Sequence, residues 1–370
     1  MKKYTPIKLI NYISKEFFHS LFIVFIVFLS LSLLINFVGE MTFFKDKKIE
    51  DATWTVTYLT FYKTPNTLIE LSIFIFLFAG ILFFTKIKKN NEINTILLSG
   101  VSKSLPIISP AIISFFLGIL IIFFLSPVSS NAIKLYEKTK LPYNNNSNLI
   151  VINNQGLWFM ESLSNGFNII KADRILDNNF QKIKNVTIYN LDNNFNFIKR
   201  IDSDNIYITN KNWELEGAKI LEGLDANNQN KKKSNFTLIS TININDLKEY
   251  FSNSDTVSFW EIVNNIEILN LRGYSADELK IKFHKYLSLP IYLFGMILLS
   301  TIFTISINKD YNTLMYLFFG LIVGFILYFL NDLSIAIGLS NKLPLLVSVW
   351  SPVIVIIFLC TINLIKINEN

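Results

Sequence analysis

The chain is organised around a short polar and basic stretch between two strongly apolar segments, Thr85–Ser104, with the sequence TKIKKNNEINTILLSGVSKS. Asn91 is suited to be a helix N-cap, and Glu92 would then place a negative charge in the first turn, where the helix dipole favours it. Residues with an apolar side chain, or with none, follow at helical spacing. They are Ile93, Ile96, Leu97 and Gly100. A helix this short needs a surface to lie against. Because apolar segments flank it, we expect it at a membrane surface.

The spacing alone leaves two interpretations of this segment open. One is an ordinary amphipathic loop helix that rests on lipid. The other is a helix that carries force between the membrane spans and a partner in the water phase. Short motifs also arise by chance, so the structural context has to decide between them.

The composition outside this stretch is that of a membrane protein. Of the 370 residues, 51% are hydrophobic and 15% are aromatic, which is unusual for a soluble domain. Six apolar runs are long enough, at about 1.5 Å per residue, to cross a hydrocarbon core of about 30 Å. They are Phe17–Gly39, Leu71–Thr85 with an extension back to Thr64, Leu105–Ser126, Tyr286–Asn308, Tyr311–Asn331 and Leu343–Ile365. The first is too long for a signal peptide and no small-residue cleavage site follows it.

A hydrophilic segment, about 128–285, divides these spans into three before it and three after it. It contains short β-rich runs separated by turn sequences, which predict a sandwich or jelly roll. The runs are LIVINN, GLWFM, FNIIKADRI, KNVTIYNL, FIKRI, NIYIT and WELEGAKI. The predicted fold class is therefore an α-helical membrane protein with six transmembrane helices and an inserted β-jellyroll-like domain.

Two capping boxes end this segment: Ser258 with Glu261, and Ser275 with Glu278. The second predicts a helix that leads directly into the fourth span. Such a helix would make either a hinge-like mechanical coupling or a plain rigid connection between domain and span.

The reactive side chains exclude several classes of function. Cys360 is the single cysteine, so an intrachain disulfide is impossible and zinc or redox chemistry is effectively excluded. His19 and His284 lie where spans meet water and are expected to be interfacial anchors rather than a metal pair. The net charge of +6, with Lys and Arg near span ends, favours anionic lipid or lipid-like ligands over nucleic acid.

No motif for catalysis or nucleotide binding is present. The stretch from Gly100 to Ser104 lacks the second glycine of a phosphate-binding loop, and no HExxH, CxxC or G-x-S-x-G occurs. Ionisable residues near the spans are functional candidates by default, although anchoring at the water boundary is an equal alternative. They are Glu40, Glu70 and Asp332, all expected at the outer end. No chain of acids crosses the membrane, so energy must come from a partner.

Positive charge does not fix the orientation of the spans, because the tallies on the two sides are similar. The basic cluster before the first span favours a cytoplasmic N-terminus.

Several sequences, taken in their order and spacing, carry a family resemblance. They are Asn91-Glu92-Ile93 through Gly100-Val101-Ser102, Gln155-Gly156-Leu157-Trp158, and Gly320-x-x-x-Gly324-Phe-x-x-Tyr328 followed by Asn331-Asp332. Together with the division into three and three spans, they resemble the LptF/LptG permeases over essentially the whole chain. The run at 155–158 and the stretch that begins at Arg272 are more similar to LptG than to LptF.

The resemblance implies a permease subunit of an ABC transporter in the bacterial inner membrane. It would extract lipopolysaccharide and pass it to a periplasmic bridge toward the outer membrane. Implied partners are an LptF-like permease, an LptB-like ATPase dimer, and LptC-like and LptA-like periplasmic proteins. This chain would bind no cofactor, and ATP-Mg would bind the ATPase. Implied domains are 1–127 with a coupling helix at about 90–103, the periplasmic β-jellyroll at 128–285, and 286–370, with both termini cytoplasmic.

The resemblance also implies site residues. The helix that docks on the ATPase would use Glu92, Ile93, Ile96, Leu97 and Gly100, with Glu92 paired to a basic residue of the ATPase. The lipopolysaccharide path would include Leu33, Asn36, Phe37, Lys134, Phe325 and Tyr328.

The outer end of the first span departs from the family pattern. Asn36 stands where relatives often carry a basic residue, and Gly39 where an acid is common, which puts a direct phosphate clamp in doubt. Lys134 matches a basic position, and Lys45, Lys47 and Lys48 could substitute from the loop. The alternative is that these lysines bind bulk anionic headgroups.

A function of a different class also remains open. The chain would then be a membrane-anchored periplasmic receptor or scaffold without transport activity. A mechanotransmitting ABC permease of another type is a third option, although such permeases usually have four spans.

Overall fold

The computed structural model describes residues 7–45, 52–98, 100–102, 104–140, 143, 149–153, 156–163, 166–175, 182–209, 212–222, 231–240, 254–271, 275–305 and 312–369. The chain forms two compact units. The first comprises Met1–Tyr136, Ser258–Trp260 and Lys280–Asn370, and the second comprises Glu137–Val257 and Glu261–Leu279.

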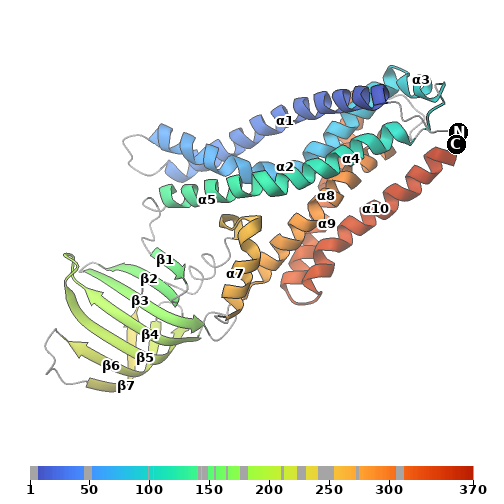
Figure 1. Ribbon diagram of the computed structural model, residues 1–370. Helices are drawn as coiled ribbons and strands as arrows, with labels where there is room; N and C mark the ends of the chain where they lie inside the picture. The colour runs from blue at the N-terminus through green and yellow to red at the C-terminus, as the bar shows by residue number, and fades with distance from the viewer. Residues whose placement is uncertain are drawn as a thin grey trace. The chain divides into compact units, whose positions relative to one another are not determined.

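Long helices make up the first unit and run along one another (Figure 1). They are α1 (Ile7–Phe44), α2 (Ala52–Lys89), α4 (Leu105–Leu120), α5 (Ser126–Lys140), α8 (Asp277–Thr304), α9 (Thr313–Leu339) and α10 (Leu345–Glu369), with the short α3 (Glu92–Leu98) after α2. In the part of the chain that the structure describes, six helical runs are long and apolar enough to cross a membrane, α4 and α5 counting as one run. The predicted membrane class with six spans is confirmed.

The third span is longer than the sequence suggested. We expected it to end near Pro127, but the helix continues to Lys140. A π-helical turn, η1 (Ile121–Leu125), lies between α4 and α5 and directly precedes Pro127. This wider turn accommodates the missing backbone N–H of the proline, so the helix does not end there.

Helix α8 is the central helix of the first unit. In the most apolar part of α8, 72% of the residues are buried, against 17% in α1 and in α9. Small residues let its neighbours approach closely. A Cβ added to Gly118 on α4 would lie 2.7 Å from the Cα of Pro290 on α8.

Glycines also allow close packing between α9 and α2. On α9, Gly320 faces Ile81 and Gly324 faces Phe74, so that helix packs on α2.

The second unit is built on one curved antiparallel sheet (Figure 1). Its strands are β1 (Leu149–Asn153), β2 (Gly156–Leu163), β3 (Gly166–Ile175), β4 (Lys182–Leu191), β5 (Phe197–Thr209), β6 (Asn212–Glu222) and β7 (Lys231–Ile239). Each strand pairs with the next one along the chain, from β1 to β7. The predicted inserted β domain is confirmed.

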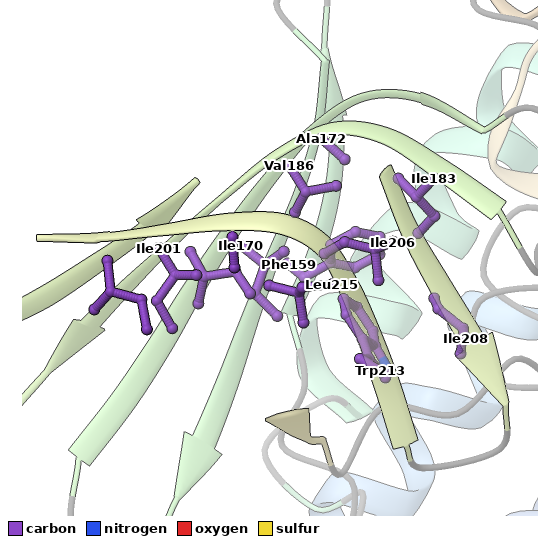
Figure 2. Packing of buried hydrophobic residues seen from close by; sticks show 13 residues of the cluster. Phe159, Ile170, Ala172, Ile183, Val186, Ile201, Ile206, Ile208, Trp213 and Leu215 are labelled. Carbon is purple, nitrogen blue, oxygen red and sulfur yellow. The ribbon is translucent and has the colours of Figure 1, made fainter. Parts of the chain in front are cut away.

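One face of this sheet carries the core of the second unit. Residues of β2 to β6 point to this face with the period of two of a strand, except at one irregular step within each of β4, β5 and β6. The steps are three positions from Ile183 to Val186, five from Ile201 to Ile206 and three from Leu215 to Ala218. Figure 2 shows the cluster, in which Trp213 and Phe159 pack edge to face with ring centroids 6.2 Å apart.

The runs FIKRI and NIYIT, which we expected to be separate strands, form the single strand β5. Ser203, between them, donates its hydroxyl to the backbone oxygens of Asn205 and Glu216, each at 2.8 Å. These bonds keep the polar middle of the strand within the sheet.

Helices follow the sheet, as the capping boxes predicted. They are the short 3-10 turn η3 (Ser254–Thr256), α7 (Phe259–Leu271) and α8. The backbone N–H of Asp277 donates to the Ser275 hydroxyl at 3.3 Å, so Ser275 caps α8. The expected domain boundaries at 128 and 285 lie inside α5 and α8, which are continuous helices.

Candidate functional site

Helix α3 lies within the polar stretch that began the sequence analysis. It is at the end of the first unit where α1 begins and α10 ends (Figure 1). The helix covers Glu92–Leu98. Beyond it, Gly100 has a φ of 79°, a left-handed conformation that glycine adopts without strain. The structure thus contains a short helix where the sequence predicted one.

Asn91 stands at the predicted N-cap position, directly before α3, but its backbone differs from that of an ordinary N-cap residue. Its φ is 55°, whereas an N-cap residue normally has an extended backbone. Its backbone N–H donates to the Lys88 oxygen at 3.1 Å, and its own oxygen accepts from the Thr95 N–H at 3.3 Å. Asn91 is therefore the left-handed turn residue that ends α2 and leads into α3, a role that asparagine tolerates.

Polar side chains tie α3 and the end of α2 to helix α1. The Tyr12 hydroxyl donates to a carboxylate oxygen of Glu92 at 3.1 Å. The Asn90 side-chain amide donates to the other oxygen of Glu92 at 2.9 Å. One turn further along α1, Glu16 forms an ion pair with Lys86. Glu92, which we expected to face the ATPase, thus contacts the first span of its own chain.

Two lysines at the end of α2 reach the fourth and fifth spans. Lys88 donates to the backbone oxygen of Thr304, the last residue of α8, at 3.1 Å and to the Tyr316 hydroxyl at 3.3 Å. Lys89 donates to the Thr313 hydroxyl, in the first turn of α9, at 2.8 Å. A cation at the carboxyl end of α8 is favoured by the helix dipole. The segment that carries α3 is therefore bonded to α1, α8 and α9.

The two faces of α3 have opposite exposure. Ile96 is buried, whereas the Leu98 side chain is 90% exposed. The positions are two residues apart, so they point to nearly opposite sides of the helix. The side chains of Ile93 and Leu97 lie outside the described set. The sequence analysis did not include Leu98 among the candidate site residues. Its position directly after Leu97, at the end of the apolar run, could have indicated it.

Asn36, predicted to lie on the lipid path, faces the inside of the first unit. It is 5% exposed, and its amide donates to the hydroxyls of Thr67 on α2 at 3.1 Å and Ser32 at 3.4 Å. Leu33 and Phe37, on either side of it, are partly exposed. Asn36 therefore joins α1 to α2, while the most exposed residues around it are Leu34, Ile35 and Val38.

The other predicted path residues lie on α9 and α5. Phe325 is 63% exposed. Tyr328 packs its ring against Phe74 of α2 at 5.7 Å and hydrogen-bonds Asp332 with its hydroxyl. Lys134 is an exposed residue of α5. Helices α1 and α9 both pack on α2, so the predicted residues of these two helices share a neighbouring helix, whereas Lys134 lies on α5.

The three acids near the span ends all have partners. Glu40 is 3% exposed and accepts a hydrogen bond of 2.7 Å from the Tyr136 hydroxyl. Glu70 accepts one of 3.1 Å from Asn66, whose own oxygen accepts from Ser129 at 3.2 Å. Within the described ranges, no group of three or more His, Cys, Asp and Glu side chains is placed to hold a metal ion.

An apolar cleft of about 300 Å³ lies between the third and fourth spans. It is lined by Ile112 and Phe115 of α4 and by Ile291 and Phe294 of α8. Sequence reasoning had placed an apolar path along the first and fifth spans instead.

One comparison with known proteins gives a match. A family model described as lipopolysaccharide export system permease LptF/LptG matches residues 11–366. The search of the curated proteins gives no match.

Proposed function

We propose a function for this chain on the premise that it belongs to the LptF/LptG family of lipopolysaccharide export system permeases. It has a role in lipopolysaccharide export as a multi-pass membrane protein. We infer further that it is an LptG-type permease half of an ABC transporter. In this role it draws lipopolysaccharide from the inner membrane and hands it to a periplasmic bridge.

The observation that carries the proposal is the extent of the family match. Residues 11–366 include both sets of spans and the inserted sheet, so the match is not limited to one domain. Side-chain exposure supports a partner within the membrane. Helices α1 and α9 are apolar but mostly unburied in the single chain. A second permease, lipid, or both would cover these faces.

The cytoplasmic ATPase is proposed to act on α3. Its exposed Leu98 is the apolar contact, and its buried Ile96 holds α3 on the rest of the chain. A push on α3 would reach α1 through Tyr12 and Glu16, and would reach α8 and α9 through Lys88 and Lys89. ATP-Mg would bind the LptB-like ATPase.

Lipopolysaccharide is proposed to pass along the exposed residues of α1 and α9. Leu33, Phe37 and Phe325 offer apolar surface to acyl chains. Lys134 offers charge-assisted hydrogen bonds to phosphate groups. Binding of bulk anionic lipid is the alternative for this lysine. The sheet would lie in the periplasm, with both termini in the cytoplasm, and would contact LptC-like and LptA-like proteins.

The test is reconstitution of the chain in liposomes with an LptF-like permease and an LptB-like ATPase. We expect ATP hydrolysis to rise when lipopolysaccharide is present, and lipopolysaccharide to appear on an added LptA-like acceptor. Phospholipid of equal charge serves as the control. A membrane-anchored receptor or scaffold would co-purify with neither the ATPase nor the second permease and would show no lipid-dependent hydrolysis. That outcome would reject the proposal.

A further inference from the structure

The third span is irregular at one place, η1. The backbone N–H of Ser126 donates to the oxygen of Ile121, five residues earlier, as in a π-helix. Such a turn holds one more residue than an α-helical turn and is frequent at functional sites. Every residue after it is rotated by about 100° relative to an uninterrupted α-helix. The turn therefore decides which way Ser126 points.

Ser126 is fully buried, and its hydroxyl accepts a hydrogen bond of 3.0 Å from the backbone N–H of Phe259. Phe259 is the first residue of α7. The first N–H groups of a helix have no partner within the helix, so they need one from outside. A side chain of the third span thus caps the helix that follows the sheet.

Aromatic rings fix the same turn of α7 on both sides. Trp260 meets Phe123, a residue of η1, edge to face at 4.8 Å. Phe259 stacks on Phe283 of α8 at 5.9 Å and meets Tyr286 of α8 edge to face at 6.0 Å. The first turn of α7 is therefore bonded to the third span and to the fourth span together.

The position of these contacts along the chain gives them mechanical importance. Residues Ser258–Trp260 belong to the first unit, and α7 continues from Glu261 into the second unit. Any relative movement of the third and fourth spans has to move or break the contacts at Ser126, Phe259 and Trp260.

We propose that Ser126 is a positioning residue for lipopolysaccharide export. The π-helical turn directs its hydroxyl to the start of α7, and this bond links movement of the third and fourth spans to the helix that leads to the sheet domain. The inference rests on the proposed function, and it adds to that function a route by which the spans control the sheet domain.

The test uses the complete reconstituted complex with the variant Ser126→Ala. We expect the basal ATP hydrolysis and the binding of lipopolysaccharide to be unchanged. The transfer of lipopolysaccharide to the LptA-like acceptor should fall about fivefold, the factor that follows from losing one helix cap. Ser126→Thr keeps the hydroxyl and should restore transfer.

Ser130→Ala is the matched control. Ser130 is also buried on α5, but its hydroxyl donates to Pro127 in its own helix at 3.1 Å. Its loss should leave transfer unchanged. Hydrogen exchange at the first turn of α7 should quicken in Ser126→Ala and not in Ser130→Ala, which reports the lost cap independently of activity.

A second variant deletes Phe124, an exposed residue of η1, to restore a regular helix. Because the deletion removes the one extra residue that the π-helical turn holds, the regular helix keeps Ser126 directed at Phe259, and transfer should be retained. Loss of transfer in this variant would show that the turn itself is needed and not the bond of Ser126. If the wild-type complex transfers lipopolysaccharide and Ser126→Ala transfers it equally well, the positioning role is wrong and the proposed function stands. If the wild-type complex transfers none, the proposed function fails and this inference fails with it.

Discussion

The Tyr136 hydroxyl on α5 donates a hydrogen bond of 2.7 Å to the carboxylate of Glu40 on α1. Glu40 is 3% exposed, so this bond lies inside the first unit. It joins the end of the first span to the helical extension of the third span. A buried carboxylate is costly unless donors surround it, and a hydroxyl donor at this distance offsets part of that cost.

Tyr136→Phe should destabilise the protein by about 1–3 kcal/mol, because the buried carboxylate loses a donor. The loss of stability caused by Tyr136→Phe should be smaller in a chain that already carries Glu40→Gln. A buried neutral amide costs less than a buried carboxylate when it loses a hydrogen-bond donor. Thermal unfolding in detergent of the two single variants and the double variant measures this coupling. Additive effects would show that the two side chains act independently.

Gly118→Ala should destabilise the first unit by about 1–3 kcal/mol through overpacking. The added Cβ would lie 2.7 Å from the Cα of Pro290, a backbone atom of α8 that cannot turn away. Gly39→Ala is the matched control on α1, because its Cβ would meet nothing within 4 Å. That variant should be neutral or slightly more stable, as alanine favours a helix. Equal unfolding temperatures for both would contradict the close approach of α4 and α8.

Leu98→Asp should abolish binding of the ATPase while the chain stays folded and inserted, because Leu98 is exposed and makes no core contact to lose. Ile96→Asp places a charge in a buried position and should loosen α3 itself. Pull-down of the ATPase, with circular dichroism as the folding control, separates the two effects. Normal ATPase binding by Leu98→Asp would remove α3 as the docking element.

Glu92→Lys should prevent transport while leaving the protein folded, as the proposed coupling role requires. The structure adds a discriminating control, since Tyr12 donates to Glu92 from α1. Tyr12→Phe removes this internal bond alone. If Tyr12→Phe lowers lipopolysaccharide-linked ATP hydrolysis as much as Glu92→Lys, Glu92 acts by holding α3 on α1. If Glu92→Lys keeps full hydrolysis and ATPase affinity, neither role holds.

The turn between β4 and β5 should respond to pH through Asp192. Hydrogen bonds from the Asn196 side chain and backbone, and from the Asn194 backbone, lower the pKa of Asp192 below its ordinary value of 3.8. A lowered pKa means that the stabilisation is present above the ordinary value and is lost as the pH falls through the folded value. Asp192→Ala should therefore speed hydrogen exchange in 191–197 at pH 7. The difference from wild type should vanish in strong acid, and a difference that persists there would rule out this cause.

The sequence allowed the architecture to be predicted because its signals are local. A span needs one long apolar run, and a strand needs one short β-rich run, so neither depends on distant residues. The same locality explains the errors. FIKRI and NIYIT looked separate because the residues between them are polar, but pairing with β4 and β6 continues through this stretch, and Ser203 adds bonds to Asn205 and Glu216.

The candidate site was harder to predict. It depends on which face of a helix each side chain lies on, and on contacts between residues that are far apart in the sequence. In a membrane span both faces are apolar, so the sequence could not tell that Phe325 points outward. For Asn36 the polar amide was a signal for a neighbouring helix, but the sequence could not name its partner, Thr67. The bond from Phe259 to Ser126 joins residues 133 positions apart. No local pattern predicts such a pair, and the π-helical turn that aims Ser126 has no distinctive composition.

The order of the strands has a consequence for biosynthesis. Each strand from β1 to β7 pairs with the one made just before it. Contacts between chain neighbours form quickly and require little loop closure. The sheet can therefore grow one hairpin at a time as the polypeptide is synthesised, before the last three spans have been made. Among the strands that the structure describes, β1 and β7 lie at the two ends of the order, so they are the earliest and latest products, separated in time as well as in space.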